Sequence, residues 1–296
     1  MKPAAFDYRR PATVDEVVAL LAEHGDEAKV LAGGQSLVPA MNFRLAQPRI
    51  LIDLQDVAGL DHLEESAGAL RIGAMCRQRQ VERSPLVAER TPLLAAAMPS
   101  IAHPQIRNRG TFGGSLAHAD PASELPAVLA ALGGRLRVRR QSAEEWVAVD
   151  DFFVSLFTTA LGSDGLLLEV EVPFQEAASG WAFEEFSRRH GDYALVGVAV
   201  VLGFAGARCR HARIALFSVG EGPVRARRAE ELLQAGSWED ADAATATLQR
   251  AASTAAQEDI EPPGDIHASA DYRRHLAEVL TGRTLRRAAE RAGRSL

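Results

Sequence analysis

Two glycine-rich segments, well separated along the chain, constrain it more than any other feature. The first reads Ala32-Gly33-Gly34-Gln35-Ser36-Leu37, and the second reads Thr111-Phe112-Gly113-Gly114-Ser115. Glycine adopts positive φ angles at no steric cost, and its lack of a side chain lets a ligand touch the main chain. Successive backbone N–H groups in such turns form an anion-binding concavity. Two such turns facing each other would hold a diphosphate from both sides, so the sequence predicts a dinucleotide-binding protein.

The residues around the glycines limit the classes of ligand that could bind there. Gln35 and Ser36 follow the first pair and Ser115 follows the second, and a hydroxyl there can donate to a phosphate oxygen. Neither segment has the lysine of a Walker sequence, which argues against a triphosphate bound with magnesium. Neither has the three spaced glycines of a Rossmann dinucleotide fold. Because turns use glycine everywhere, either segment alone is weak evidence, and it is the pair that favours a ligand site.

Composition excludes several classes of function. The chain has 296 residues, 47% hydrophobic and 24% charged, which is typical of a globular protein with two domains. Its net charge of −6 gives no reason to expect nucleic acid or an anionic membrane as a partner. The longest apolar run, residues 194–207, is too short to cross a bilayer, and residues 1–11 carry no cleavage signal, so we expect a cytoplasmic protein without a transmembrane segment. With only two cysteines, Cys76 and Cys209, the chain alone cannot hold an iron–sulfur cluster.

Hydrophobic periodicity and turn residues predict a mixed α and β chain. Helices are expected at Thr13–Glu23, Gln78–Val81, Leu86–Met98, Glu124–Leu132, Arg225–Ala235, Ala241–Ala256 and Asp271–Ala292. Strands are expected at Lys29–Ala32, Ile50–Leu54, Leu70–Gly73, Arg135–Arg139, Gly165–Val172, Ala194–Phe204 and His211–Val219. These elements suggest one α+β subdomain over about residues 1–55 and a second over about 56–176. The polar, small-residue stretch Phe174–Gly180 is typical of a linker, so a C-terminal domain is expected over 177–296.

A few polar residues outside the glycine segments are also candidates. His118, Asp120 and Glu124 lie where a loop enters a helix, and helix capping explains them better than a metal site. The Glu124 carboxylate, which only accepts hydrogen bonds, also suits the hydroxyls of a sugar or ribityl chain. Tyr193, beside Asp192, either stacks on a flavin or packs at a domain interface, and the sequence leaves both open. No residue is assigned as a catalytic acid, a catalytic base or a metal ligand.

Further segments match a known family. They are Phe6-Asp7-Tyr8, Asn42-Phe43-Arg44-Leu45, His103-Pro104-Gln105-Ile106-Arg107-Asn108-Arg109-Gly110-Thr111, Gly191-Asp192-Tyr193-Ala194 and Tyr272-Arg273. Together with the two glycine segments they span the whole chain, and the Arg-Asn-Arg-Gly-Thr run beside the glycine pairs is highly specific. The chain resembles the FAD-binding medium subunit of molybdenum hydroxylases, the family of xanthine dehydrogenase and carbon monoxide dehydrogenase.

The resemblance implies a fold and a set of FAD contacts. The fold is α+β: a vanillyl-alcohol-oxidase-like FAD-binding fold of two α+β subdomains, then a C-terminal domain with a three-stranded antiparallel sheet and helices. The diphosphate of FAD would lie on the two glycine segments. Ile101 would contact the flavin, Glu124 the polar side of FAD and Leu168 an apolar part of it. Tyr193 would lie against the isoalloxazine ring, with Asp192 as a further FAD contact.

The resemblance also implies an electron-transfer role in a heterotrimer that doubles into a dimer. A large subunit would oxidise an N-heteroaromatic or purine-like compound, carbon monoxide or an aldehyde on a molybdenum cofactor. The iron–sulfur clusters of a small subunit would pass electrons to this FAD and on to an external acceptor. Several relatives have a lysine where this chain has Glu184-Glu185, so its flavin potential is expected to differ. The alternatives are a self-contained FAD oxidase, for which no substrate base is visible, and a non-catalytic nucleotide-binding protein.

Overall fold

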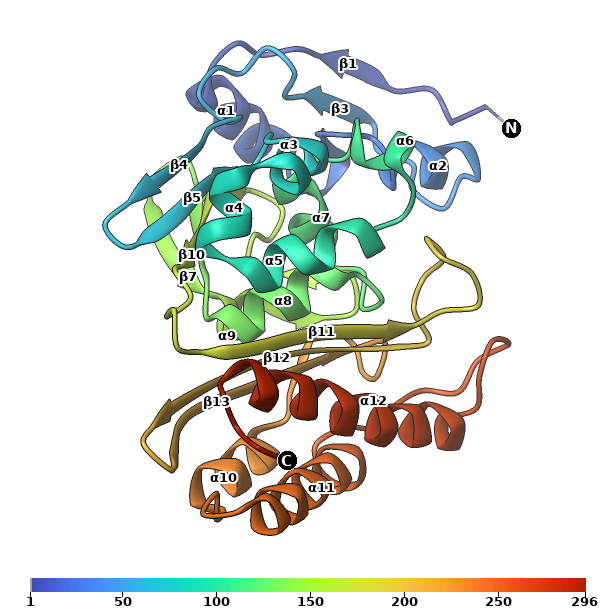
Figure 1. Ribbon diagram of the computed structural model, residues 1–296. Coiled ribbons are helices and arrows are strands. Elements are labelled where there is room, and N and C mark those ends of the chain that lie inside the picture. Colours follow the sequence, from blue (N-terminus) through green and yellow to red (C-terminus); the bar gives the residue numbers. More distant parts are fainter. Residues whose placement is uncertain (1) are drawn as a thin grey trace.

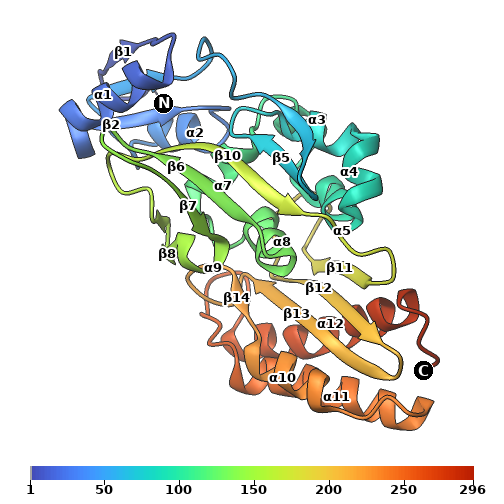
Figure 2. The ribbon, with the colours of Figure 1, turned by 90° about the vertical axis from the view of Figure 1, so that its left-hand side faces the viewer.

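Three main sheets follow one another along the long axis of the molecule in the computed structural model, which describes residues 2–296 (Figures 1 and 2). The first sheet is parallel, with the strand order β1-β3-β2. The helix α1 begins at the capping box that Thr13 and Glu16 predict, and it buries one apolar face against β2 and β3. The elements of this part are β1 Asp7–Arg9, α1 Val14–His24, the 3₁₀ turn η1 Gly25–Glu27, β2 Ala28–Leu31, α2 Leu37–Asn42 and β3 Ile50–Asp53.

The second sheet is antiparallel, with the strand order β4-β5-β10-β6-β7. Its strands are β4 Leu63–Ser66, β5 Ala69–Gly73, β6 Arg135–Arg139, β7 Glu144–Ala148 and β10 Leu166–Pro173. The helices between β5 and β6 build the core beside it: α3 Gln78–Arg83, α4 Pro85–Arg90, α5 Pro92–Ala97, the 3₁₀ turn η2 Met98–Ser100, α6 Pro104–Arg107, α7 Phe112–His118 and α8 Glu124–Leu132. A short helix and a hairpin follow β7: α9 Val149–Phe152, β8 Phe153–Ser155 and β9 Thr158–Thr159.

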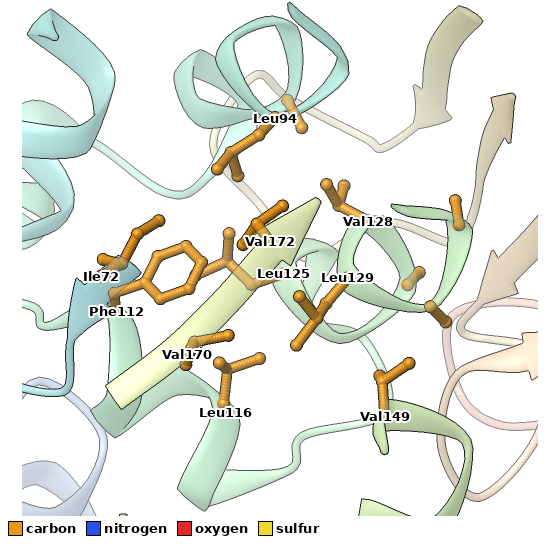
Figure 3. Packing of buried hydrophobic residues seen from close by; sticks show 14 of the residues in the cluster. Ile72, Leu94, Phe112, Leu116, Leu125, Val128, Leu129, Val149, Val170 and Val172 are labelled. Carbon is orange, nitrogen blue, oxygen red and sulfur yellow. The ribbon is translucent and has the colours of Figure 1, made fainter. Parts of the chain in front are cut away.

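The core of this middle part fixes the position of α7. Phe112 and Leu116 of α7 meet Ile72 of β5 and Val170 of β10 in a closely packed cluster (Figure 3). Phe112 is 1% exposed and Leu116 is fully buried. Truncating a side chain packed in this way costs about 2–5 kcal/mol. The hydrophobic core therefore fixes the position of the first turn of α7, which carries the second glycine pair.

The third sheet lies between helices from two parts of the chain. α8 packs on β12 and β13 from one side, and α12 lies along β11 and β12 on the other (Figure 1). Residues 196–203 of β12 are all buried, as expected for a strand covered on both faces. The elements are β11 Gly180–Phe186, β12 Val196–Ala205, β13 Arg208–Phe217, β14 Val224–Arg225, α10 Arg227–Ala235, α11 Ala241–Glu258 and α12 Ala270–Arg291. The sheet is antiparallel in the order β11-β12-β13-β14, and β14 adds only a two-residue edge to the three long strands.

The differences from the sequence predictions have local causes. The single helix expected over Leu86–Met98 is wrong, because the chain forms two helices that meet at Thr91, which has φ −138° and ψ 64°. Pro92 disfavours helical geometry in the residue before it. The sequence pattern does not predict the strand β11, because the polar stretch Phe174–Gly180 indicates a linker and the next expected strand begins at Ala194. Elsewhere the expected helices and strands are confirmed, with bounds that differ by a few residues.

Candidate functional site

The two glycine segments meet in space. A Cβ atom added to Gly33 would lie 2.5 Å from the carbonyl oxygen of Arg109 and 2.8 Å from the Cα of Gly110. A Cβ added to Gly114 would lie 3.4 Å from the Cβ of Ala32. The end of β2 therefore packs directly against the start of α7. This contact joins the first parallel sheet to the middle part of the molecule.

The first segment leaves β2 and turns sharply into α2. Gly34 has φ +71°, a left-handed conformation that favours glycine, and the side-chain amide of Gln35 donates to the Gly33 carbonyl at 3.1 Å. Within residues 2–296, the N–H groups of Gly33, Gly34 and Gln35 have no acceptor, and the Ser36 hydroxyl caps nothing. Leu37, the last expected contact, begins α2. A row of unpaired N–H groups is the arrangement that binds an anion, so these residues fit a phosphate group.

The second segment is the first turn of a helix rather than a loop, which corrects the sequence interpretation. Thr111 is the N-cap of α7, and its hydroxyl accepts from the Gly114 N–H at 3.0 Å. Neither glycine of this pair has a positive φ angle. Gly113 is needed instead for close packing, because a Cβ there would lie 2.6 Å from the Cα of Ala74. Ser115 follows in the same turn. The helix N-terminus adds a partial positive charge where the two segments meet.

The acidic and aromatic candidates gather beyond the C-terminal end of α7. Glu124 is the first residue of α8 and is 7% exposed, and burial raises its pKa to about 7. Tyr193 is 64% exposed, while desolvation of its hydroxyl and the nearby Asp120 carboxylate raise its pKa to about 12. Asp192 is exposed, and its N–H donates to the carbonyl of Arg189. The Tyr193 hydroxyl thus lies near the α7–α8 connection, and stacking on a flavin stays a prediction.

The loop that carries Tyr193 is fastened by buried hydrogen bonds. The Ser218 hydroxyl donates to the Ala194 carbonyl at 2.7 Å, and the Ser218 N–H donates to the Pro121 carbonyl at 2.8 Å. Arg273, near the start of α12 and 5% exposed, donates to the carbonyl oxygens of Leu195 and Ser218. The C-terminal helix thus holds the strand ends on which Tyr193 sits.

The apolar candidates lie on different elements, Ile101 in the turn after η2 and Leu168 in the strand β10. Ile101 is 6% exposed and follows η2, and Ala102 after it has φ +44°. Leu168 is 8% exposed at a bulge in β10, and its carbonyl accepts from the Ala74 N–H at 2.8 Å. Ala74 in turn accepts from Gly113, so Leu168 is linked to the start of α7 through two backbone hydrogen bonds.

Glu184 and Glu185 take opposite sides of β11. Glu184 pairs with Arg287 of α12 at 3.0 Å and with Arg283 at 3.4 Å, so it serves the C-terminal domain. Glu185 lines a cavity of about 400 Å³ together with Ser100 and His190. One of its carboxylate oxygens is buried without a partner within residues 2–296, and burial together with nearby Glu124 raises its pKa to about 8. Glu184 also borders this cavity, but its carboxylate is engaged by the two arginines of α12.

His118 and Asp120, whose residue types could suggest a metal site, make other contacts. The His118 ring lies 5.1 Å from the ring of Phe157, and burial lowers its pKa. The Asp120 carboxylate accepts from the Ala122 N–H at 2.9 Å, as in a loop that leads into a helix. In the described part of the chain, no three His, Cys, Asp or Glu side chains gather closely enough to hold a metal ion.

Sequence reasoning missed one buried ion pair beside the site. Arg107 is 4% exposed, bonds to Glu82 and donates to the carbonyl oxygens around Ile101. The only sequence signal was the position of Arg107 inside the family-like segment, because its partners come from elsewhere in the fold.

Two protein-family models match nearly the whole chain. The FAD binding domain in molybdopterin dehydrogenase matches residues 4–175, and the CO dehydrogenase flavoprotein C-terminal domain matches residues 181–288. The chain belongs to the FAD-binding subunits of the molybdenum hydroxylases. This flavoprotein subunit is an oxidoreductase component whose cofactor is FAD, as the resemblance in the sequence implied.

Relatives of known activity resemble the flavoprotein subunit over its whole length. The 6-hydroxypseudooxynicotine dehydrogenase complex subunit alpha of Paenarthrobacter nicotinovorans is 42% identical, covering 99% of this chain and 97% of the relative. The caffeine dehydrogenase subunit beta of a Pseudomonas species is 40% identical, covering 98% and 97%. Among solved structures, a chain of carbon monoxide dehydrogenase from Hydrogenophaga pseudoflava superposes with a TM-score of 0.93 at 38% identity, covering 98% and 99% of the two chains. The α+β fold expected for this family is thereby confirmed.

The geometry fits FAD. When bound, FAD supplies the redox chemistry, and the protein supplies binding, orientation and electrostatics. The unpaired N–H groups of the first segment and the N-terminus of α7 would hold the diphosphate. The Glu124 carboxyl would accept from the sugar or ribityl hydroxyls, and the exposed face of Tyr193 is free for a planar ring.

Proposed function

We propose that this chain carries electrons through one non-covalent FAD, from the iron–sulfur clusters of a small partner subunit to an external acceptor. The observation that supports it most strongly is the meeting of the first glycine segment, with its unpaired N–H groups, and the N-terminus of α7. In this proposal the FAD-binding domain is residues 1–176, with subdomains of about 1–55 and 56–176. Residues 177–296 form the C-terminal domain.

The proposed FAD contacts run along this junction. Residues 32–37 and the turn of Thr111, Gly113, Gly114 and Ser115 hold the diphosphate. Glu124 faces the polar part of FAD, and Leu168 faces an apolar part. Ile101, Asp192 and Tyr193 surround the isoalloxazine ring. Tyr193 is 64% exposed, which suits a side chain that stacks on a ligand.

The positions of the two cysteines support the proposal that electrons reach this chain from a partner subunit. Cys76 and Cys209 lie in two separate hydrophobic clusters and are at most 1% exposed, so neither is placed to hold a cluster. The relatives include subunits of a 6-hydroxypseudooxynicotine dehydrogenase complex and of caffeine dehydrogenase. We therefore propose a heterotrimer with a molybdenum-binding large subunit and an iron–sulfur small subunit, paired into a dimer of trimers in the cytoplasm.

The substrate would be oxidised on the large subunit. N-heteroaromatic or purine-like compounds, carbon monoxide and aldehydes are the classes we propose, since the relatives include subunits of caffeine dehydrogenase, carbon monoxide dehydrogenase and glyceraldehyde dehydrogenase. Every helix within residues 2–296 is too short or too polar to pass through a bilayer.

Isolation of the complex through a tag on this chain tests the proposal. We expect one FAD per chain, released into the supernatant by acid, together with molybdenum, iron and sulfide in two partner chains. The complex should reduce an artificial dye, and the isolated chain should bind FAD without oxidising substrate. Turnover by the isolated chain at the rate of the complex would favour the self-contained oxidase, and a chain without flavin would favour the nucleotide-binding alternative.

A further inference from the structure

The ion pair of Arg107 and Glu82 is buried beside the proposed flavin ring. The Arg107 Nε atom lies 2.9 Å from one carboxylate oxygen of Glu82, and Nη2 lies 3.1 Å from the other. This two-point contact fixes the plane of the guanidinium as well as its position. Burial alone would raise the pKa of Glu82, and the hydrogen bonds from Arg107 and Arg79 more than offset this, so that its pKa is lowered.

The same guanidinium holds the turn that follows η2. Its Nη1 atom donates to the carbonyl oxygen of Ile101 at 2.7 Å and to that of Ala102 at 3.0 Å. Ala102 has φ +44°, a left-handed conformation that L-residues other than glycine adopt at a cost. Two charge-assisted hydrogen bonds to this turn stabilise the strained conformation, so the direction of the Ile101 backbone depends on Arg107.

The turn also supports the loop that carries Tyr193. Gly191 has φ +87°, and a Cβ atom there would lie 2.5 Å from the His103 ring and 3.0 Å from the Ala102 carbonyl oxygen. The loop between β11 and β12 rises from the sheet toward α6 (Figure 1), and Gly191 in this loop lies against the turn. A shift of the turn would therefore move both Ile101 and Gly191, which lies two residues before Tyr193 in the loop.

We propose that Arg107 and Glu82 are a positioning pair, which sets the surroundings of the flavin ring through the Ile101–Ala102 turn without touching FAD. The inference rests on the proposed placement of the ring between Ile101 and Tyr193. Arg107 is thus a positioning residue, not a catalytic one. The diphosphate contacts lie on other elements, so the pair governs the ring environment more than the retention of FAD.

Two variants separate this role from simple folding. Arg107→Lys keeps a positive charge opposite Glu82, but its single ammonium cannot reproduce the planar fork that reaches the carboxylate and both carbonyls. Ala102→Gly leaves the ion pair intact and removes the strain of the turn, because glycine accepts the left-handed conformation at no cost, so the turn then depends less on Arg107. Arg79→Gln is the matched control, since Arg79 bonds to the same carboxylate of Glu82 at 2.8 Å but donates to no carbonyl of the turn.

The full-length chain loaded with FAD is the material for the test. We expect Arg107→Lys to bind one FAD per chain, with an altered visible circular dichroism of the flavin and a shifted midpoint potential. Its dissociation constant for FAD should rise by no more than about fivefold, the equivalent of one lost hydrogen bond. Ala102→Gly alone should match the parent chain, and in combination with Arg107→Lys it should bring the circular dichroism and the potential back toward those of the parent. Arg79→Gln should match the parent chain in all three measurements.

The outcomes distinguish the two levels of the proposal. A parent chain that binds no flavin would contradict the proposed function itself. A parent chain that binds FAD normally, with unchanged circular dichroism, potential and affinity in Arg107→Lys, would overturn the positioning pair. A double variant that stays as altered as Arg107→Lys alone would overturn the role of the Ile101–Ala102 turn. If Arg107→Lys fails to fold, Glu82→Gln decides by the same readouts, because it keeps Arg107 but weakens the contact that fixes its guanidinium.

Discussion

Gly33 faces the carbonyl oxygen of Arg109 so closely that a Cβ atom in its place would lie 2.5 Å from that oxygen. The obstacle is backbone on both sides, so Gly33→Ala must push the first segment away from α7. Overpacking of this kind costs about 1–3 kcal/mol, which corresponds to roughly 5- to 150-fold in FAD affinity where FAD binding must restore the original contact. Titration of the FAD-free chain with FAD, followed by flavin fluorescence, measures the loss. Gly282→Ala is the control, because its Cβ would make ordinary contact with Ala252 at 3.6 Å, and equal affinities of the two variants would contradict the prediction.

The N-cap of α7 links stability to cofactor binding. Thr111→Ala removes the hydroxyl that accepts from the Gly114 N–H, and loss of such a cap costs about 1 kcal/mol of the free energy of unfolding. We expect FAD affinity to fall as well, because the first turn of α7 is no longer held. Thr111→Ser keeps the oxygen and should retain both properties. Urea unfolding and FAD titration of the two variants check this, and an unaffected Thr111→Ala would show that the cap is dispensable.

The Tyr193 ring and its hydroxyl have separable roles. Tyr193→Ala removes a stacking surface worth about 1 kcal/mol, so FAD should bind several-fold more weakly. Tyr193→Phe keeps the ring and loses only the hydroxyl that faces Asp120, and its affinity should stay near that of the parent. Flavin absorbance, affinity and midpoint potential are the measurements. An equal loss in both variants would assign the role to the hydroxyl instead of the ring.

Glu185 makes the stability of the FAD-free chain depend on pH. Its pKa is raised by burial from 4.5 to about 8, so the folded chain binds more protons than the unfolded chain between these values. This contribution is therefore fully present below about pH 4.5 and is lost as the pH rises toward 8. The urea concentration at the unfolding midpoint should decrease as the pH rises from 5.5 to 8. In Glu185→Gln this decrease should be smaller.

Glu124 remains in that variant and keeps part of the pH dependence, since its pKa of about 7 is also raised. The exposed Glu64→Gln is the control and should retain the full slope. A slope in Glu185→Gln as steep as in the parent would refute the assignment to Glu185.

The sequence predicted those parts of the site that depend on local chemistry. Thr13 and Glu16 form the predicted capping box, and Gly34 has the positive φ angle that its place in a sharp turn suggests. The second glycine pair was expected to form a loop, and it is helical because Phe112 and Leu116 anchor that turn in the core. The glycines are needed there for close packing. A sequence alone does not distinguish a glycine required for packing from one required for a flexible turn.

The rest of the site depends on contacts between distant residues. Arg107 meets Glu82 and the Ile101 carbonyl only after α3, η2 and α6 have packed together. The strand β11 carried a usable signal, because Trp181 and Phe183 alternate with smaller or polar residues, yet the preceding polar stretch obscured it. The two glutamates of this strand face opposite sides, and only the known register of β11 separates their roles.

Arg273 gives the molecule an order of assembly. It fastens Leu195 and Ser218 from α12, so the loop that presents Tyr193 is completed by a residue made about 80 positions after Tyr193 itself. Both glycine-bearing segments leave the ribosome long before it. A nascent chain can therefore fold its nucleotide-binding elements first, and the wall over the flavin ring closes last. Under the proposed placement of FAD, stable loading of the cofactor therefore follows the synthesis of α12.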